Sequence, residues 1–234
     1  SLRRAKGGHK PPFLRTISSG VSTGLSPARR RCLIPCKIPP MLAVPLTPEV
    51  LVTAYANGIF PMDVEGEIQW FSPDPRAIIE LETFHVPKNL ARKYRSRRFD
   101  VRFDAAFPQV IHACANRHEG TWISKEIEVA YTRLHELGLA HSVESWQTGE
   151  LVGGLYGVAL GGAFFGESMF HQATDASKIA LVALVERLRQ REFSILDVQF
   201  TTPHLTQFGV REIPRSDYLA RLQAALDQHC QFAD

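Results

Sequence analysis

The chain has 234 residues, 44% of them hydrophobic and 22% charged, an ordinary composition for a globular protein that can bury an extensive core. Its net charge of +3 arises at one end, because residues 1–40 contain nine of the 27 Lys and Arg residues and none of the 24 acids. Residues 41–234 therefore hold 18 basic and 24 acidic residues, which excludes a globally basic surface for binding a polyanion. The sequence contains no run of 18 apolar residues, so no membrane span is predicted.

Residues 1–40 are rich in Ser, Gly, Pro and Arg and lack apolar periodicity. We expect a disordered basic tail or a non-native extension, although organelle transit peptides share this composition. Cys32, Cys36, Cys114 and Cys230 are too few and too irregularly spaced for a disulfide framework, and Cys32-x3-Cys36 lacks a second pair of zinc ligands. This cysteine usage favours a reducing cytoplasm.

A small first domain is predicted at residues 41–87. The sequence Thr47-Pro48-Glu49 predicts a helix start, with a Thr cap, a Pro in the first position and an acid in the first turn, and Gly58 suits its end. Short strands are expected at residues 68–71 and 77–81.

A basic cluster opens the second predicted domain, residues 88–234. Six basic residues occur here without an acid: Lys88, Arg92, Lys93, Arg95, Arg97 and Arg98. A solvated helix face is one interpretation. The other is a local foothold for a nucleic-acid backbone, with Tyr94 and Trp122 as stacking surfaces for unpaired bases.

The rest of this domain alternates helices and strands. Strands are predicted at 99–103, 141–146, 151–158, 162–169 and 193–200, and helices at 107–116, 124–138, from 175 onward and at 216–226. This order, with its central antiparallel ribbon, predicts the α/β (α+β) class: a mixed, largely antiparallel sheet with helices.

Glu167, Asp197 and Gln199 lie in segments that otherwise read as buried strands, where polar side chains are costly unless they are hydrogen-bonded. Strand alternation places Asp197 and Gln199 on one face, together with Ile195 and Thr201. Leu196, Val198 and Phe200 should point to the opposite face, toward a core.

Two interpretations of these polar residues remain open. In one, the acids are strand-end carboxylates bonded to backbone amides or to a nearby Arg. In the other, they form a site that orients an amine and accepts its proton during attack on an activated acyl group, while an amide stabilises the oxyanion. Within residues 41–234 the HExxH, G-x-S-x-G, P-loop and strand-anchored GxGxxG motifs are all missing, so metal, triad and nucleotide chemistry lack support there.

Ten ordered segments between about residues 40 and 226 together resemble the leucyl/phenylalanyl-tRNA–protein transferase family. They include Ala54-Tyr55-Ala56-Asn57-Gly58-Ile59-Phe60-Pro61, Trp70-Phe71-Ser72-Pro73-Asp74-Pro75-Arg76, Thr121-Trp122-Ile123, Phe165-Gly166-Glu167-Ser168-Met169-Phe170 and Asp197-x-Gln199. The resemblance implies a small N-terminal domain joined to a larger domain similar to the GCN5-related acetyltransferases.

The resemblance also implies an activity. Such enzymes move Leu or Phe, and less readily Met, from aminoacyl-tRNA to the N-terminal Arg or Lys of cytoplasmic proteins, which marks them for N-degron proteolysis. Because the ester is already activated, no cofactor, ATP or metal is expected, and no membrane is involved.

Residue roles follow from the matched segments. The resemblance implies catalytic roles for Asp197, Gln199 and Glu167. It implies contacts with the terminal adenosine of tRNA for Trp122, Trp70 and Phe71, and an aminoacyl side-chain pocket at Leu155, Phe164 and Leu181. Met62, Phe71 and Leu155 depart from the residues common in the family.

Two other functions compete with this one. An acyl-CoA-dependent N-acetyltransferase would share the larger domain, but the Q/R-x-x-G-x-G/A loop of such enzymes does not occur at residues 173–178. A non-catalytic tRNA-binding module would leave Asp197 and Gln199 unexplained.

Overall fold

The computed structural model describes residues 45–118 and 120–233, so the predictions for the tail and for Cys32 and Cys36 fall outside the described part. A seven-stranded sheet has the order β4-β5-β6-β7-β8-β3-β9, and β1 and β2 form a separate hairpin. The strands are β1 (Phe60–Val64), β2 (Glu67–Phe71), β3 (Arg76–Ile79), β4 (Asp100–Phe103), β5 (Ala140–Gln147), β6 (Glu150–Leu160), β7 (Ala163–His171), β8 (Ile195–Gln199) and β9 (Val210–Ile213).

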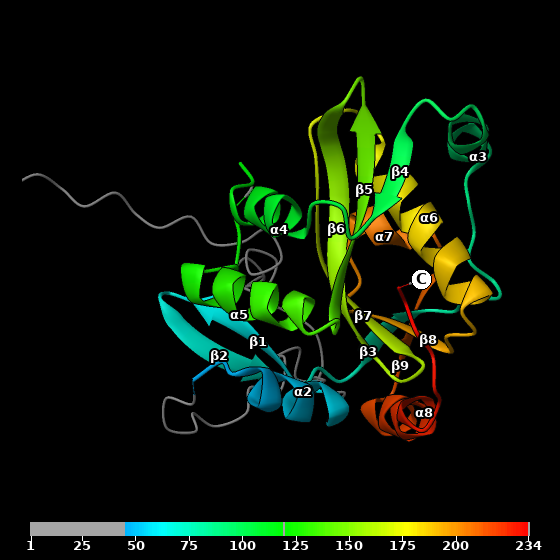
Figure 1. Cartoon of the computed structure of the whole chain (residues 1–234). Coiled ribbons are helices and arrows are strands. Elements are labelled where there is room, and N and C mark those ends of the chain that lie inside the picture. Colours follow the sequence, from blue (N-terminus) through cyan, green and yellow to red (C-terminus); the bar gives the residue numbers. More distant parts are fainter. Residues whose placement is uncertain (1–44, 119, 234) are drawn as a thin grey trace, which may run out of the picture.

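Helices cover both faces of the large sheet. They are α2 (Pro48–Ala56), α3 (Lys88–Arg95), α4 (Phe107–Ala115), α5 (Lys125–Glu136), α6 (Ala176–Gln190), α7 (Pro203–Thr206) and α8 (Arg215–Leu226). Figure 1 shows α4 and α5 on one face and α3 and α6 on the other. Each face has its own hydrophobic core: the first core joins α2, α4, α5 and α8, and the second core joins α3 and α6. Among the described residues, no helix is long and apolar enough to cross a membrane.

The predicted helix boundaries are confirmed where capping residues mark them. The side chains of Thr47 and Ser124 accept hydrogen bonds from the N–H groups of Val50 and Ile127, which satisfies one free donor at the start of α2 and of α5. Gly58 and Gly138 follow these helices with φ angles of 70° and 73°, a backbone conformation that glycine adopts without strain.

The sheet is mixed and largely antiparallel, which confirms the predicted α+β class. All neighbouring strands run antiparallel except β7 and β8, which are parallel. Gly153 in β6 lets α6 begin close to the sheet, because a Cβ at this position would lie 2.5 Å from the Cβ of Ala176. The N-terminus of α6 is therefore held tightly against the centre of the sheet.

Three short elements, β1, α7 and β9, are additions to the predicted set. Strand β3 lies within the predicted first domain, residues 41–87, yet it pairs with β8 and β9 in the large sheet. The separate hairpin of β1 and β2 ends at Phe71. The domain boundary at residue 87 stays a prediction, and strand pairing favours a smaller first unit.

The predicted alternation along residues 195–201 holds only as far as Val198. Ile195 belongs to the first core, whereas Leu196 and Val198 pack in the second core, as expected. The expectation for Phe200 is wrong: its ring packs edge-on against Phe60 in the first core, 5.8 Å between centroids. The cause is Gln199, whose φ of 58° ends the extended strand and reverses the alternation.

Candidate active site

Asp197 lies in the middle of β8 and is fully buried. Its carboxylate accepts four hydrogen bonds. Arg76 donates from Nε to Oδ1 (2.9 Å) and from Nη2 to Oδ2 (2.6 Å), and the hydroxyl of Tyr218 donates to Oδ2 (2.7 Å). The backbone N–H of Gln199 donates to Oδ1 (2.9 Å). Asp197 is thus held in one orientation with its hydrogen-bonding capacity filled.

Arg76 is equally buried, and its surroundings explain why a cation is stable there. Its Nη1 donates to the carbonyl of Gly58 (3.0 Å), and its guanidinium lies 4.9 Å from the ring centroid of Phe60 and 4.6 Å from that of Tyr218. Burial alone would lower the pKa of Arg76, but the Asp197 carboxylate outweighs that effect and raises the pKa. The pair is therefore a buried, two-point salt bridge.

Gln199 follows Asp197 in a left-handed backbone conformation, with φ of 58°. The hydrogen bond from its N–H to Asp197 Oδ1 stabilises this turn. Its side-chain Nε2 is buried and has no hydrogen-bond partner among the described residues. A buried amide donor without a partner is costly, so this group is available to a ligand.

Glu167 occupies a β-bulge in β7. Tyr156 pairs with Ser168 and Gly157 pairs with Gly166, so Glu167 is the extra residue between them. A bulge changes the direction of a side chain, and here it brings Glu167, which is half-buried, to the hydroxyl of Tyr55, which donates to its Oε1 (2.7 Å).

A pair of buried tyrosines supports this carboxyl group. The hydroxyl of Tyr55 also forms a hydrogen bond with the hydroxyl of Tyr131, so the two side chains order one another. Burial raises the pKa of Glu167 to about 8; the Tyr55 hydrogen bond and the Arg76 charge oppose this shift, and the Asp197 charge adds to it. Glu167 can thus exchange a proton near neutral pH.

The three predicted catalytic residues are consequently brought into one region. Asp197 and Gln199 are in direct contact, and the charge of Asp197 acts on the pKa of Glu167. The contacts of Asp197 with Arg76 and with a backbone amide also agree with the other interpretation of the sequence, in which the acids are strand-end carboxylates with a purely structural role. The sequence analysis missed Arg76 as the partner, although a buried Asp in a strand requires a cation or several donors.

The predicted aminoacyl pocket residues lie on the other face of the sheet. Leu155, Phe164 and Leu181 are all buried in the second core, Leu155 and Phe164 on the sheet and Leu181 on α6. Glu167 and Asp197 instead meet side chains of the first core. Pairing between β7 and β8 ends at Phe165 and Asp197. The polar site residues thus begin where this pairing ends, whereas the apolar pocket candidates belong to the second core.

The predicted adenosine contacts gather around the β1–β2 hairpin. The carbonyl of Trp122, a residue that is 9% exposed, accepts a hydrogen bond from the N–H of Asp63 in β1 (3.0 Å). Trp70 is half-buried and pairs opposite Pro61. Phe71 is buried and stacks on Phe60, with 6.2 Å between ring centroids. Of the three, Trp70 is the most open to solvent.

Five of the six cluster residues are exposed, on α3 and in the turn after it: Lys88, Arg92, Arg95, Arg97 and Arg98. Lys93 differs, because its ammonium pairs with Asp175 at the start of α6. Tyr94 donates a hydrogen bond to Glu186 (2.7 Å) and packs against the second core, which leaves it less available for stacking than expected. These two contacts fix α3 on α6.

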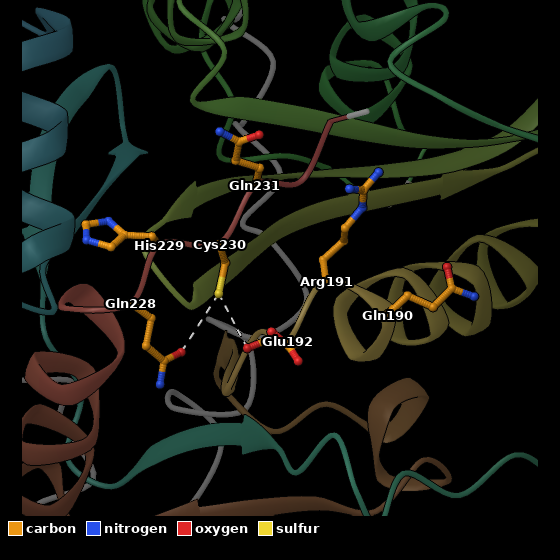
Figure 2. Close-up of a pocket in the computed structure, with 7 residues that line it drawn as sticks. All are labelled: Gln190, Arg191, Glu192, Gln228, His229, Cys230 and Gln231. Carbon is orange, nitrogen blue, oxygen red and sulfur yellow. Dashed lines mark hydrogen bonds between the residues drawn. The ribbon is translucent and has the colours of Figure 1, made fainter.

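A surface pocket lies elsewhere, between the end of α6 and residues 228–231. Figure 2 shows Cys230 at its centre, with hydrogen bonds from its thiol to the carbonyl of Glu192 (3.4 Å) and to Oε1 of Gln228 (3.9 Å). None of the predicted site residues lines this pocket. Within residues 45–118 and 120–233, no three His, Cys, Asp or Glu side chains are placed to hold a metal ion.

Comparison with known proteins agrees with the resemblance. The sequence model described as "Leucyl/phenylalanyl-tRNA protein transferase" matches residues 78–223, and that of the N-terminal domain of the same family matches residues 45–74. A leucyl/phenylalanyl-tRNA–protein transferase of Herpetosiphon aurantiacus is 57% identical over 188 residues, covering 80% of this chain and 98% of its own. Its counterpart in Gloeobacter violaceus is 56% identical over 194 residues, covering 82% and 100%.

Resemblance to solved structures is more distant. A structure of L-PGS from Bacillus licheniformis is 14% identical with a TM-score of 0.39, and the match covers 68% of this chain and 55% of that one. So distant a likeness says nothing further about the site.

Proposed function

The chain belongs to the leucyl/phenylalanyl-tRNA–protein transferase family, and we propose that this enzyme moves Leu or Phe, and less readily Met, onto the N-terminal Arg or Lys of acceptor proteins. The transfer takes place in the cytoplasm and marks the acceptor for N-degron proteolysis. The observation that carries the proposal is the pair of unlike carboxyl groups, Glu167 and Asp197, beside Gln199, whose Nε2 has no partner among the described residues.

The reaction forms one C–N bond and breaks one C–O bond. The neutral α-amino nitrogen of the acceptor attacks the carbonyl carbon of the aminoacyl ester, and the ribose oxygen of the terminal adenosine leaves. The nitrogen loses a proton, the ribose oxygen gains one, and no redox change occurs. A group that accepts and returns a proton near neutral pH suits this balance.

Glu167 fits the proton-accepting role better than Asp197 does. The pKa of Glu167 is raised to about 8, and among the described residues its carboxyl has one hydrogen-bond donor, Tyr55. Asp197 already accepts four hydrogen bonds and is fully buried. We therefore assign Glu167 to proton transfer and Asp197 to holding Gln199.

Gln199 is assigned to the developing oxyanion. Its Nε2 is a buried donor without a partner in the described structure, and its backbone is fixed by Asp197. A preorganised amide donor aimed at an ester carbonyl stabilises the negative charge that forms there during attack.

Binding is divided between three surfaces. The side chain of the transferred residue is assigned to the apolar cluster of Leu155, Phe164 and Leu181, where apolar burial favours Leu and Phe over small or charged residues. Trp122 and Trp70, with Phe71 behind them, receive the terminal adenosine. The exposed residues of the basic cluster contact the tRNA backbone.

A transfer assay tests the proposal. Purified protein is given radiolabelled leucyl-tRNA and a peptide that begins with Arg, without ATP, and label is expected in the peptide. A peptide that begins with Glu is the matched control and stays unlabelled. Absence of label in the Arg peptide, with tRNA and peptide both intact, contradicts the proposal, and turnover of acetyl-CoA without tRNA points instead to an N-acetyltransferase.

A further inference from the structure

Arg76 connects four segments that are distant in sequence. Its guanidinium contacts the carbonyl of Gly58 after α2, the ring of Phe60 in β1, the carboxylate of Asp197 in β8 and the side chain of Tyr218 in α8. Arg76 is also among the largest side chains that are fully buried. The chain thus places a full positive charge at the junction of the hairpin, the sheet and the last helix.

Stability alone is a weak explanation for such a pair. Removing two charges from water is costly, and well-packed apolar residues of similar volume often stabilise a core as well as a buried ion pair does. An Arg–carboxylate pair also fixes the orientation of the carboxylate, because the planar fork of two N–H donors determines the plane in which the carboxylate lies. At Asp197 that plane determines where Oδ1 lies.

The position of Oδ1 affects the backbone of Gln199, two residues further along the chain. Oδ1 accepts the N–H of Gln199, whose backbone is in the left-handed region that a Gln adopts only when its surroundings require it. The same Gln199 carries the unpartnered Nε2. A continuous path of contacts therefore leads from the Arg76 fork through Asp197 to the backbone of Gln199.

We propose that Arg76 is a positioning residue, whose two-point contact orients Asp197 so that Asp197 holds the backbone and carboxamide of Gln199 in place for the acyl transfer. This proposal rests on the function proposed above, because Gln199 acts on the substrate only in that reaction. Tyr218 assists by fixing Oδ2 from the other side.

A second Arg–carboxylate pair in the same molecule provides a matched control. Arg221 donates from Nη1 and Nη2 to the two oxygens of Glu80, 2.8 Å each, but this pair is partly exposed and neither residue contacts Asp197 or Gln199 in the described structure. Replacing Arg by Lys is the same chemical change at both places.

The first measurement is steady-state transfer of Leu. In Arg76→Lys the charge is kept but a single ammonium cannot reproduce the fork, so kcat should fall about 100-fold while the KM for leucyl-tRNA changes by no more than about 2-fold. Tyr218→Phe, which loses the hydrogen bonds of the hydroxyl with Asp197 and Arg76 and keeps the ring over Arg76, should lower kcat about 10-fold. Arg221→Lys should leave both constants within about 2-fold of the parent.

The second measurement is independent of activity: amide hydrogen exchange at Gln199, followed by NMR. Exchange of this N–H should accelerate at least about 10-fold in Arg76→Lys, while amides in the paired strands β6 and β7 keep their protection. Should Arg76→Lys not fold, Tyr218→Phe gives the same two measurements in a milder form.

The outcomes separate the two proposals. Unchanged exchange at Gln199, or faster exchange with an unchanged kcat, overturns the positioning role. A general loss of protection with parallel losses in kcat and in tRNA binding also overturns it, because it reveals a purely structural pair. If the parent protein transfers no Leu at all, the proposed function fails, whereas exchange at Gln199 still decides whether Arg76 holds the turn.

Discussion

Two acidic residues in one site receive different chemistry from their surroundings. Asp197 is surrounded by four donors, including a guanidinium, whereas Glu167 receives one hydroxyl from Tyr55 and has a pKa raised to about 8. Such a division between neighbouring acids is the usual way in which an enzyme separates a fixed charge from a group that moves protons. The bulge at Glu167 creates the difference by removing its side chain from the regular strand.

The rate of transfer should therefore depend on the protonation of Glu167. Below pH 8 this carboxyl is mostly protonated and cannot accept a proton, so kcat/KM should rise with pH through about 8. The acceptor amine, with an ordinary pKa of about 8, contributes a second rising step. Glu167→Gln should lower kcat/KM by about 100-fold or more and remove one of the two steps, which a plot of log kcat/KM against pH from about 6 to about 9 detects.

The control for this profile is an acceptor peptide whose α-amino group has a lower pKa. It should shift the second step in both proteins and leave the Glu167 step in the parent unchanged. A Glu167→Gln variant with the parent's rate and the parent's slope would exclude Glu167 from proton transfer.

The same residue should limit the stability of the fold at high pH. The folded-state pKa of about 8 lies above the usual value of 4.5, so the folded state binds the proton more tightly, and stability is lost as pH rises from 4.5 through 8. Glu167→Gln removes this loss and should raise the free energy of unfolding by about 1–3 kcal/mol near pH 9, and by less near pH 6. Thermal unfolding of both proteins at the two pH values measures it, and equal Tm differences at both would contradict the raised pKa.

At the scale of single elements, α3 shows how a short basic helix is kept in place. Its eight residues are too few to be stable alone, and two contacts to α6 hold it: Lys93 with Asp175, and Tyr94 with Glu186. The remaining basic side chains are left accessible on one fixed surface. The helix thus has an anchoring part and a part that is free for a polyanion.

This division predicts unequal effects on tRNA binding. Replacing Arg95, Arg97 and Arg98 together by Ala should weaken binding and lower the slope of log K against log salt by about 2, at about 0.7–0.9 for each phosphate that the protein no longer neutralises. Lys93→Ala should change the slope by much less, because its charge already pairs with Asp175. Filter binding between about 50 and about 200 mM salt measures the slopes, and equal changes for Lys93 and Arg95 as single variants would contradict this division.

Elements with local signals were predictable and those set by pairing were not. The starts of α2 and α5 follow from the hydrogen bonds of Thr47 and Ser124 to their own first turns, which are recognisable in the sequence. Strand β9 is four residues long and owes its conformation to pairing with β3. Short strands of this kind have no signature in the chain itself.

The residues of the candidate site divide in the same way. Asp197 and Gln199 could be predicted as functional candidates because polar residues in an apolar strand need an explanation. Arg76 could not be paired with Asp197, since the contact spans 121 residues and depends on β3 lying beside β8. The reversal at Gln199 escaped prediction because alternation assumes a regular strand, and it moved Phe200 to the other core.

At the scale of the whole molecule, the sheet separates two tasks. The face toward α2, α5 and α8 carries the polar residues of the candidate site, and the face toward α6 carries the apolar pocket candidates. Pairing between β7 and β8 ends at Phe165 and Asp197, where the sequence of β8 reaches the first of the polar site residues.

The proposed pocket predicts that a substitution within it changes the preference for Phe over Leu and leaves the polar site residues in place. Leu181→Ala enlarges the proposed pocket and should shift the ratio of kcat/KM values toward Phe over Leu by about 10-fold. Leu188→Ala, on the same buried side of α6 and outside the proposed pocket, should cost a similar amount of stability, about 2–5 kcal/mol, and leave the ratio unchanged. Competition between leucyl- and phenylalanyl-tRNA measures the ratio, and equal shifts in both variants would place the pocket elsewhere.

Four residues of the Arg76 junction are synthesised in the order Gly58, Arg76, Asp197 and Tyr218, and the last belongs to α8. During translation, Asp197 acquires its hydroxyl donor only when α8 has left the ribosome and docked. We expect a chain that ends before α8 to leave Asp197 without this donor and to leave one side of the first core uncovered.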